Sequence, residues 1–152
     1  AMYSVMFVCH GNICRSPMAE FIFRDAVKKA GRTGEFFVAS SAVSDEEIFG
    51  GVGNPVYPPA RAVLKAHGIS CEGKRAALLR FSDAEKYDLF ACMDESNLRS
   101  AKRILGAAGA EKCKKLLSFA GGGDVSDPWY TRDFERAYED ICRGIEGLLK
   151  TL

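Results

Sequence analysis

Two successive hydrophobic patterns open the chain, the first without polar alternation and the second with helical spacing. Residues 3–8 are rich in Val, Met and Phe, carry no charge and end at Cys9. This composition is typical of a strand that is covered on both faces. After Ser16 the period changes, with Pro17 suited to the first helical position and Gly31 to the end. The apolar positions then recur at steps of three and four residues: Ala19, Ile22, Phe23, Ala26, Val27 and Ala30.

Short apolar runs and helical patterns keep alternating along the rest of the chain. They predict strands at residues 36–41, 87–92 and 115–119, and helices at 59–67 and 95–105. The last helix shows the clearest apolar stripe: Phe134, Tyr138, Ile141, Ile145, Leu148 and Leu152. Strands that alternate with helices are typical of a parallel sheet. We therefore expect an open α/β domain with four parallel strands and about five helices.

Length, charge and cysteine content narrow the class of protein. A chain of 152 residues has the usual size of one domain, so we expect a single domain over residues 1–152. Ala1 ahead of Met2 reads as a residue added in cloning, and the sequence shows neither a secretory signal nor a membrane span. The net charge of +1 favours neither nucleic acid nor a membrane surface as partner. Six cysteines without a CxxC pair predict reduced thiols and a cytoplasmic protein.

The loop HGNICR, residues 10–15, joins the first predicted strand to the first predicted helix. In open parallel sheets the ligand crevice lies beyond the carboxyl ends of the strands, where this loop sits. Gly11 and Asn12 tolerate positive φ, so backbone N–H groups can turn inward as an anion nest at a helix N-terminus. Arg15 adds a planar fork of donors that can grip two phosphate oxygens. The loop therefore predicts a phosphate site.

Cys9 lies at the base of this loop and is the candidate nucleophile. The helix dipole and Arg15 favour its thiolate, and the Ser16 hydroxyl can stabilise that thiolate as a leaving group. A lone Cys at a strand end is more often a small buried hydrophobe, but the surrounding Gly, Asn, Arg and Ser favour a reactive thiol. The loop lacks the GKS of a nucleotide P-loop. Cys14 is either a buried residue or a second thiol that protects Cys9 as a disulfide.

At these residues the chain resembles a known family. VCHGNICRSPMAE, residues 8–20, is similar to the CX5R(S/T) signature of the low-molecular-weight protein tyrosine phosphatases, and the resemblance extends through SSAVSD, AHGIS, FACMDESNLR and DPWY. It implies a Rossmann-like fold of four parallel strands with helices on both faces. It also implies that phosphate passes from a phosphotyrosine protein or small aryl phosphate to Cys9 and then to water, leaving as inorganic phosphate. The implied substrate-binding residues of the loop are His10, Gly11, Asn12, Ile13, Cys14 and Ser16.

Expelling a phenolate requires a proton, so a carboxylic acid must reach the loop. Asp127, before Pro128 in GGGDVSDPWYTRDF, matches the family's DP motif and is the candidate general acid and, in the second step, the base. Asp124 is the local alternative. Trp129 and Tyr130 stand where the family usually has two tyrosines and are expected to stack on the substrate ring, with core packing as the alternative for Trp129.

Other residues are assigned supporting roles. By the resemblance, a hydrogen-bond network that holds the loop in shape includes Asn12, Ser16, Ser40 and His67, although a His at a helix end is often a cap. Asp94 is expected to orient Arg15, to help bind substrate or to cap a helix. The four remaining cysteines are expected to be packing or surface residues: Cys71, Cys92, Cys113 and Cys142. Residues 46–58 form a longer loop than is usual in the family, with acidic residues at its start, and should border the cleft.

Three other functions share the fold or the loop. A thioredoxin-coupled arsenate reductase needs two further cysteines close together, whereas Cys71 and Cys92 are far apart in the sequence. A protein-arginine phosphatase of the same family typically carries Thr where Ile13 stands, and an apolar Ile13 favours a phenyl ring. A phosphate-binding module without turnover would lack the nucleophile or the acid. We therefore predict a monomeric tyrosine phosphatase that needs no cofactor or metal, because Arg15 and the backbone replace a metal clamp.

Overall fold

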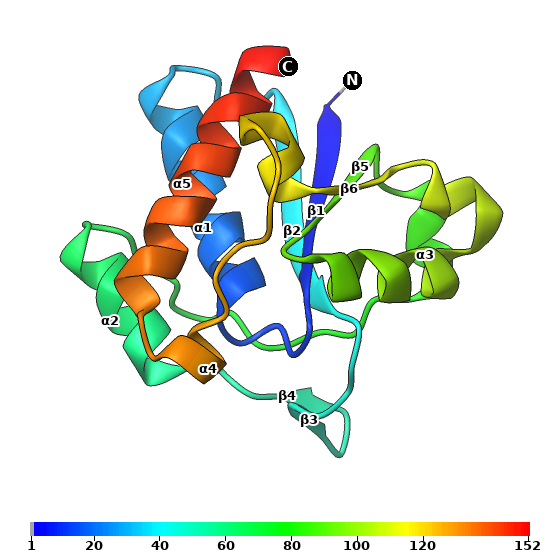
Figure 1. The fold of residues 1–152 in the computed structure, drawn as a ribbon, viewed down its shortest axis with the longest axis horizontal. Coiled ribbons are helices and arrows are strands. Elements are labelled where there is room, and N and C mark those ends of the chain that lie inside the picture. The colour runs from blue at the N-terminus through cyan, green and yellow to red at the C-terminus, as the bar shows by residue number, and fades with distance from the viewer. Residues whose placement is uncertain (1) are drawn as a thin grey trace.

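A parallel four-stranded sheet forms the centre of the computed structural model, which describes residues 2–152 (Figure 1). The strands lie in the order β2-β1-β5-β6, and each neighbouring pair is parallel. Their bounds are β1 Tyr3–Cys9, β2 Phe36–Ala42, β5 Leu89–Cys92 and β6 Cys113–Lys115. The predicted fold class is confirmed.

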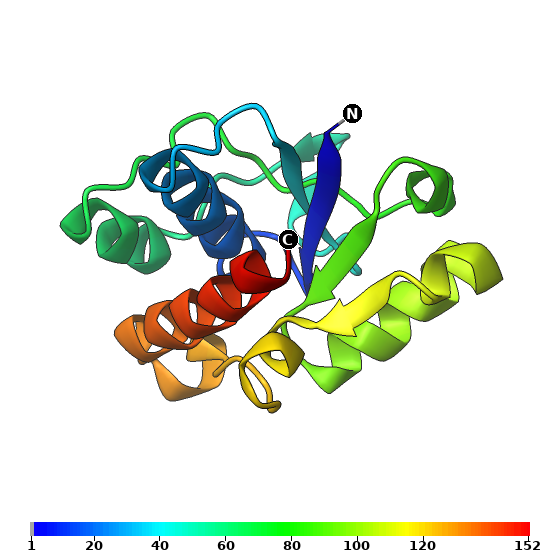
Figure 2. The ribbon, with the colours of Figure 1, turned by 90° about the horizontal axis from the view of Figure 1, so that it is seen from above.

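Strand β1 is apolar throughout because both of its faces are covered. Val5 and Phe7 belong to the core on one side of the sheet, whereas Met6 and Val8 belong to the core on the other side. The first side is covered by α1 (Arg15–Lys29), α2 (Pro58–Ala66) and α5 (Phe134–Thr151), as Figure 2 shows. The second side is covered by α3 (Glu95–Ala110) and the 3-10 helix η1 (Phe81–Glu85). The sheet therefore lies between two layers of helix.

The helices follow the predicted patterns closely. The apolar stripe of α5 is buried at Ile141, Ile145 and Leu148. Helix α3 was predicted to end at residue 105 and continues to Ala110 across a break at Gly106, where φ is 75°. Among residues 2–152, no helix is long and apolar enough to cross a membrane.

The prediction of the fourth strand was wrong in position. The strand β6 ends at Lys115, and the apolar run after it forms the 3-10 helix η2 (Leu116–Ala120). Adjacent residues of a strand point to opposite faces, whereas Leu116 and Leu117 are both buried in the core that α5 covers. The tight turn of the 3-10 helix η2, unlike a strand, places the side chains of both leucines on the side of the sheet that α5 covers.

Besides the 3-10 helix η1, two short elements were not predicted, and these two lie at the end of the molecule where β1 ends (Figure 1). One is an antiparallel hairpin of β3 (Ile48–Phe49) and β4 (Val52–Gly53), joined by Gly50 and Gly51 with φ of 58° and 79°. Positive φ at both central residues is the geometry of a two-residue hairpin turn, for which Gly-Gly is a common sequence. The other is α4 (Pro128–Thr131), a single helical turn.

Candidate active site

The loop of residues 9–15 curls around the sulfur of Cys9. Asn12 has a left-handed conformation with φ of 58°, and its backbone N–H donates to Cys9 Sγ at 3.3 Å. Helix α1 begins at Arg15, so its N-terminus points at the same place. The predicted order of strand, loop and helix is present, with Cys9 at the base of the loop.

A chain of buried polar side chains supports the loop from beneath. Ser16 Oγ lies 2.9 Å from Cys9 Sγ. Asn12 Nδ2 donates to Ser16 Oγ at 2.7 Å and to Ser40 Oγ at 3.0 Å, while the N–H of Ala77 donates to Asn12 Oδ1 at 2.9 Å. Every hydrogen-bonding atom of the Asn12 side chain is therefore occupied in holding the left-handed turn.

His67 is not part of this network, and that prediction was wrong. Its Nε2 lies 2.7 Å from Glu135 Oε1, and its ring stacks on Tyr138 with the ring centroids 3.9 Å apart. His67 directly follows α2, whereas Glu135 and Tyr138 lie on α5. The imidazole therefore fastens α2 to α5 instead of supporting the loop.

Glu20 and Lys74 stand where the network was expected to end in a histidine. Ser40 Oγ donates to Glu20 Oε1 at 2.7 Å, and Lys74 Nζ lies 3.6 Å from that oxygen and donates to Ser40 O at 3.0 Å. Burial lowers the pKa of Lys74 more than the attraction of Glu20 raises it. Glu20 lies four residues after Ser16 on α1 and so shares its face, which was an available signal; nothing in the sequence pointed to Lys74.

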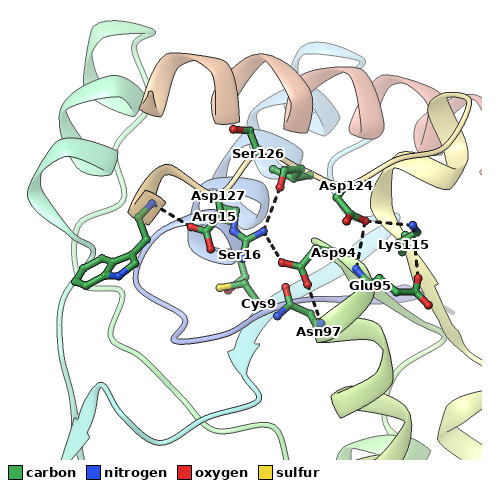
Figure 3. A network of polar contacts seen from close by, with 12 residues as sticks. Cys9, Arg15, Ser16, Asp94, Glu95, Asn97, Lys115, Asp124, Ser126 and Asp127 are labelled. Carbon is green, nitrogen blue, oxygen red and sulfur yellow. Dashed lines mark hydrogen bonds and ion pairs between the residues drawn. The ribbon is translucent and has the colours of Figure 1, made fainter. Parts of the chain in front are cut away.

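Arg15 connects the loop to two other segments of the chain (Figure 3). Its Nη1 donates to Asp94 Oδ2 at 2.9 Å and to the carbonyl of Val125 at 3.2 Å, and its Nη2 donates to Asp127 Oδ2 at 3.3 Å. Burial alone would lower the pKa of Arg15, but the negative charges of Cys9, Asp127 and Asp94 raise it above its usual value. The buried guanidinium therefore stays positively charged.

In both Asp94 and Asp127, one carboxylate oxygen accepts a hydrogen bond from the N-terminus of a helix and the other accepts one from Arg15. Asp94 Oδ1 accepts from the N–H of Asn97 at 2.8 Å and so caps α3. Asp127 Oδ1 accepts from the N–H of Trp129 at 3.0 Å and so caps α4. The predicted alternatives for Asp94, capping a helix and orienting Arg15, are both present in the structure.

Asp124, the alternative acid, faces away from Arg15. Its Oδ1 accepts from Lys115 Nζ at 3.1 Å and from the N–H of Glu95 at 3.2 Å (Figure 3). These bonds fix the segment ahead of Asp127, together with a bond from the N–H of Ser126 to the buried Asp140 of α5 at 3.0 Å. Asp124 thus positions the segment that carries Asp127.

The loop forms the floor of an open cleft of about 450 Å³. Tyr57, Trp129 and Phe134 form an aromatic wall, with Tyr57 6.3 Å from Trp129 and 6.0 Å from Phe134 between ring centroids. Trp129 is 60 % exposed, which rules out core packing, and Tyr130 also lines the cleft. Ile13 and Cys14 line it as well, and burial raises the pKa of the Cys14 thiol.

The 46–58 loop borders the cleft as expected, through Glu46, Glu47 and Tyr57. Three other cleft residues were missed from the sequence: Ser96, Asn97 and Phe134. Asn97 and Ser96 follow the capping Asp94, so the capping motif itself was a signal for them. Within residues 2–152, no group of three His, Cys, Asp or Glu side chains is arranged to hold a metal ion.

Comparisons with known proteins show what the chain is similar to in sequence and fold. A family model described as low molecular weight phosphotyrosine protein phosphatase matches residues 4–152. The low molecular weight protein-tyrosine-phosphatase YfkJ of Bacillus subtilis (strain 168) is 37% identical over 154 residues, covering 99% of this chain and 96% of the relative. The Gallus gallus low molecular weight phosphotyrosine protein phosphatase is 36% identical over 155 residues, covering 97% and 94%. The crystal structure of YfkJ from Bacillus subtilis has a TM-score of 0.92 at 36% identity, covering 99% of this chain and 94% of that chain.

We predict that Asn12→Gly and Asn12→Ala both weaken the binding of inorganic phosphate, because both remove the bonds to Ser16 and Ser40. The Ala variant should bind about tenfold more weakly than the Gly variant, since a left-handed conformation costs a residue with a Cβ about 1–2 kcal/mol. The affinity of each variant is measured as the inhibition constant of inorganic phosphate acting as a competitive inhibitor. Unchanged affinity in the Gly variant would show that the buried network does not shape the loop.

Proposed function

Because the chain belongs to the low-molecular-weight phosphotyrosine protein phosphatase family, we propose that it hydrolyses phosphotyrosine in proteins, or small aryl phosphates, through a phosphoryl group carried on Cys9. The observation that carries this proposal is the meeting of Cys9, Arg15 and Asp127 at one cleft, from three separate segments of the chain. A nucleophile, an anion clamp and a proton donor are the groups that this reaction requires.

Arg15 and the loop bind the phosphoryl group. The donors of Arg15 that the structure leaves to the cleft are Nε and the second hydrogen of Nη2, since Nη1 is occupied by Asp94 and Val125. They are proposed to grip two phosphate oxygens, while backbone N–H groups of the loop bind the others. Positive charge from these groups takes the place of a metal ion in this scheme.

In the first step, the thiolate of Cys9 attacks phosphorus and an S–P bond forms. The P–O bond to the aryl group breaks, and protonated Asp127 donates its proton to the departing oxygen. In the second step, a water molecule attacks phosphorus, Asp127 accepts a proton from it, and the S–P bond breaks. The hydroxyl group of Ser16, 2.9 Å from Cys9 Sγ, stabilises the departing thiolate by donating a hydrogen bond to it.

The aromatic wall suits the ring of the substrate. Ile13 lies on the floor of the cleft, and Tyr57 and Trp129 stand beside it, so a flat phenyl ring meets apolar surface on several sides. All groups of the site come from one chain, so we propose a monomer as the active unit. Cys9 must remain reduced to react, which favours the reducing cytoplasm as the place of action.

The proposal is tested with phosphotyrosine, phosphoserine and phosphoarginine peptides in the presence of EDTA. We expect turnover of the phosphotyrosine peptide, and its loss in Cys9→Ser, because a serine hydroxyl at this position is not ionised. Hydrolysis of the phosphoarginine peptide alone would agree with Cys9 as the nucleophile and would contradict phosphotyrosine as the substrate. No hydrolysis of any peptide would overturn the proposal and direct attention to thiol-dependent arsenate reduction.

Asp127→Asn keeps an N-cap for α4 but removes the transferable proton. We predict that kcat/KM, which reports the steps up to formation of the S–P bond, falls about 10²–10⁴-fold for phenyl phosphate and much less for nitrophenyl phosphate, whose leaving group needs less protonation. The matched control is Asp133→Asn, which likewise changes an N-cap carboxylate, that of α5, and does not line the cleft. Equal losses for both substrates in Asp127→Asn would assign the proton to another group.

A further inference from the structure

Two acidic side chains on the rim of the cleft are held against the loop of residues 9–15. Glu46 Oε2 lies 3.0 Å from His10 Nε2, the ring that directly follows Cys9. Glu47 Oε1 accepts from Asn54 Nδ2 at 2.9 Å, and its Cγ lies so near Gly11 that a Cβ there would be 3.2 Å away. Both residues line the cleft. The start of the 46–58 loop thus places its carboxylates beside the phosphate site.

The cleft has little positive charge to balance these carboxylates. Among the described residues that line it, Arg15 is the only Lys or Arg, and it is already paired with Asp94 and Asp127. Bound phosphate will occupy the remaining donors of Arg15. Glu46 and Glu47 therefore present negative charge to whatever part of a substrate extends beyond the phosphotyrosine ring.

A second hollow continues from the cleft on this side. It has a volume of about 540 Å³ and shares Ile13, Glu47 and Tyr57 with the cleft. Pro55, Val56 and Pro58 give it an apolar surface, on which the methylene groups of a long side chain can lie. Glu47 stands between the two hollows, where a residue next to a bound phosphotyrosine would pass.

The charges of the second hollow do not oppose a cation at Glu47. Lys74 lines it, but its ammonium group is directed to Glu20 and the carbonyl of Ser40. Arg61 also lines it from α2, and Glu72 lines it with the opposite charge. The hollow is therefore close to balanced, and Glu46 and Glu47 determine the sign of the charge at its entrance.

We propose that this rim is a subsite for a basic residue, so that the protein prefers substrates with Lys or Arg next to the phosphotyrosine. The proposal rests on the proposed phosphatase function and names its substrate class. The cation binds at Glu47 with support from Glu46, and its stem lies over Ile13 and Tyr57. An acidic neighbour is disfavoured because it meets two carboxylates of like charge.

The test uses three phosphotyrosine peptides that differ only in the residues on either side of phosphotyrosine, which are Lys, Gln or Glu. All assays run at the same pH, so that the three peptides differ only in the charge beside the phosphotyrosine. We expect kcat/KM for the Lys peptide to exceed that for the Glu peptide about tenfold at low salt, as two partly exposed ion pairs allow. The difference should shrink toward equality in about 0.5 M salt.

The double variant Glu46→Gln, Glu47→Gln should bring the ratio of Lys to Glu peptide close to one, and each single variant should lower it in part. Glu111→Gln, at the other end of α3, is the matched control and should leave the ratio unchanged. A merely structural role of Glu47 would lower all rates together and keep the ratio, which would overturn the proposal. Equal rates for the three peptides in the unaltered protein would overturn it as well.

Free phosphotyrosine separates this proposal from the proposed function. Hydrolysis of free phosphotyrosine without discrimination among the peptides would leave the phosphatase function standing and remove the subsite. Failure to hydrolyse free phosphotyrosine or any peptide would overturn the phosphatase function and, with it, the subsite.

Discussion

The buried guanidinium of Arg15 is the group on which the rest of the site depends. A cation in this position must be compensated, and removing one partner of a buried ion pair is strongly destabilising. Asp94, at the start of α3, and Asp127, at the start of α4, supply that compensation, and the carbonyl of Val125 adds a further acceptor. Folding thus brings the end of β1, the end of β5 and the segment before α5 to one point. The proposed general acid, Asp127, is thus one of the two carboxylates that compensate the charge of Arg15.

The sequence predicted correctly those elements whose conformation depends on residues close together in the chain. The apolar run of β1, the left-handed tolerance of Asn12 and the helical spacing after Ser16 predicted the strand, loop and helix. Asp127 was chosen because it matches the DP motif of the family and the reaction needs a proton donor, and the structure places it 3.3 Å from Arg15. His67 was assigned by likeness alone, and its actual partners, Glu135 and Tyr138, lie on a helix that is distant in the sequence. Likewise, a run such as residues 116–120 does not reveal whether it will pair with a strand or pack beneath α5.

Beneath and above the loop, charged groups have different environments and therefore different effects. Glu20 is buried and Lys74 is partly buried; both are bonded to Ser40 and so contact the support of the loop. Glu46 and Glu47 lie on the rim, held by His10 and Asn54, where they can act directly on an approaching substrate. In the proposed function the first pair supports the loop that binds phosphate, and in the proposed subsite the second pair distinguishes one polypeptide substrate from another.

The most direct test of the account is to trap the phosphorylated enzyme. The Asp127→Asn protein is mixed with nitrophenyl phosphate, denatured within one turnover and digested for mass spectrometry of its peptides. Because the variant lacks the base for the second step, we predict that phosphate accumulates on the peptide that contains Cys9, attached to sulfur. Release of nitrophenol in a burst without phosphate on Cys9, or phosphate on another residue, would contradict the mechanism.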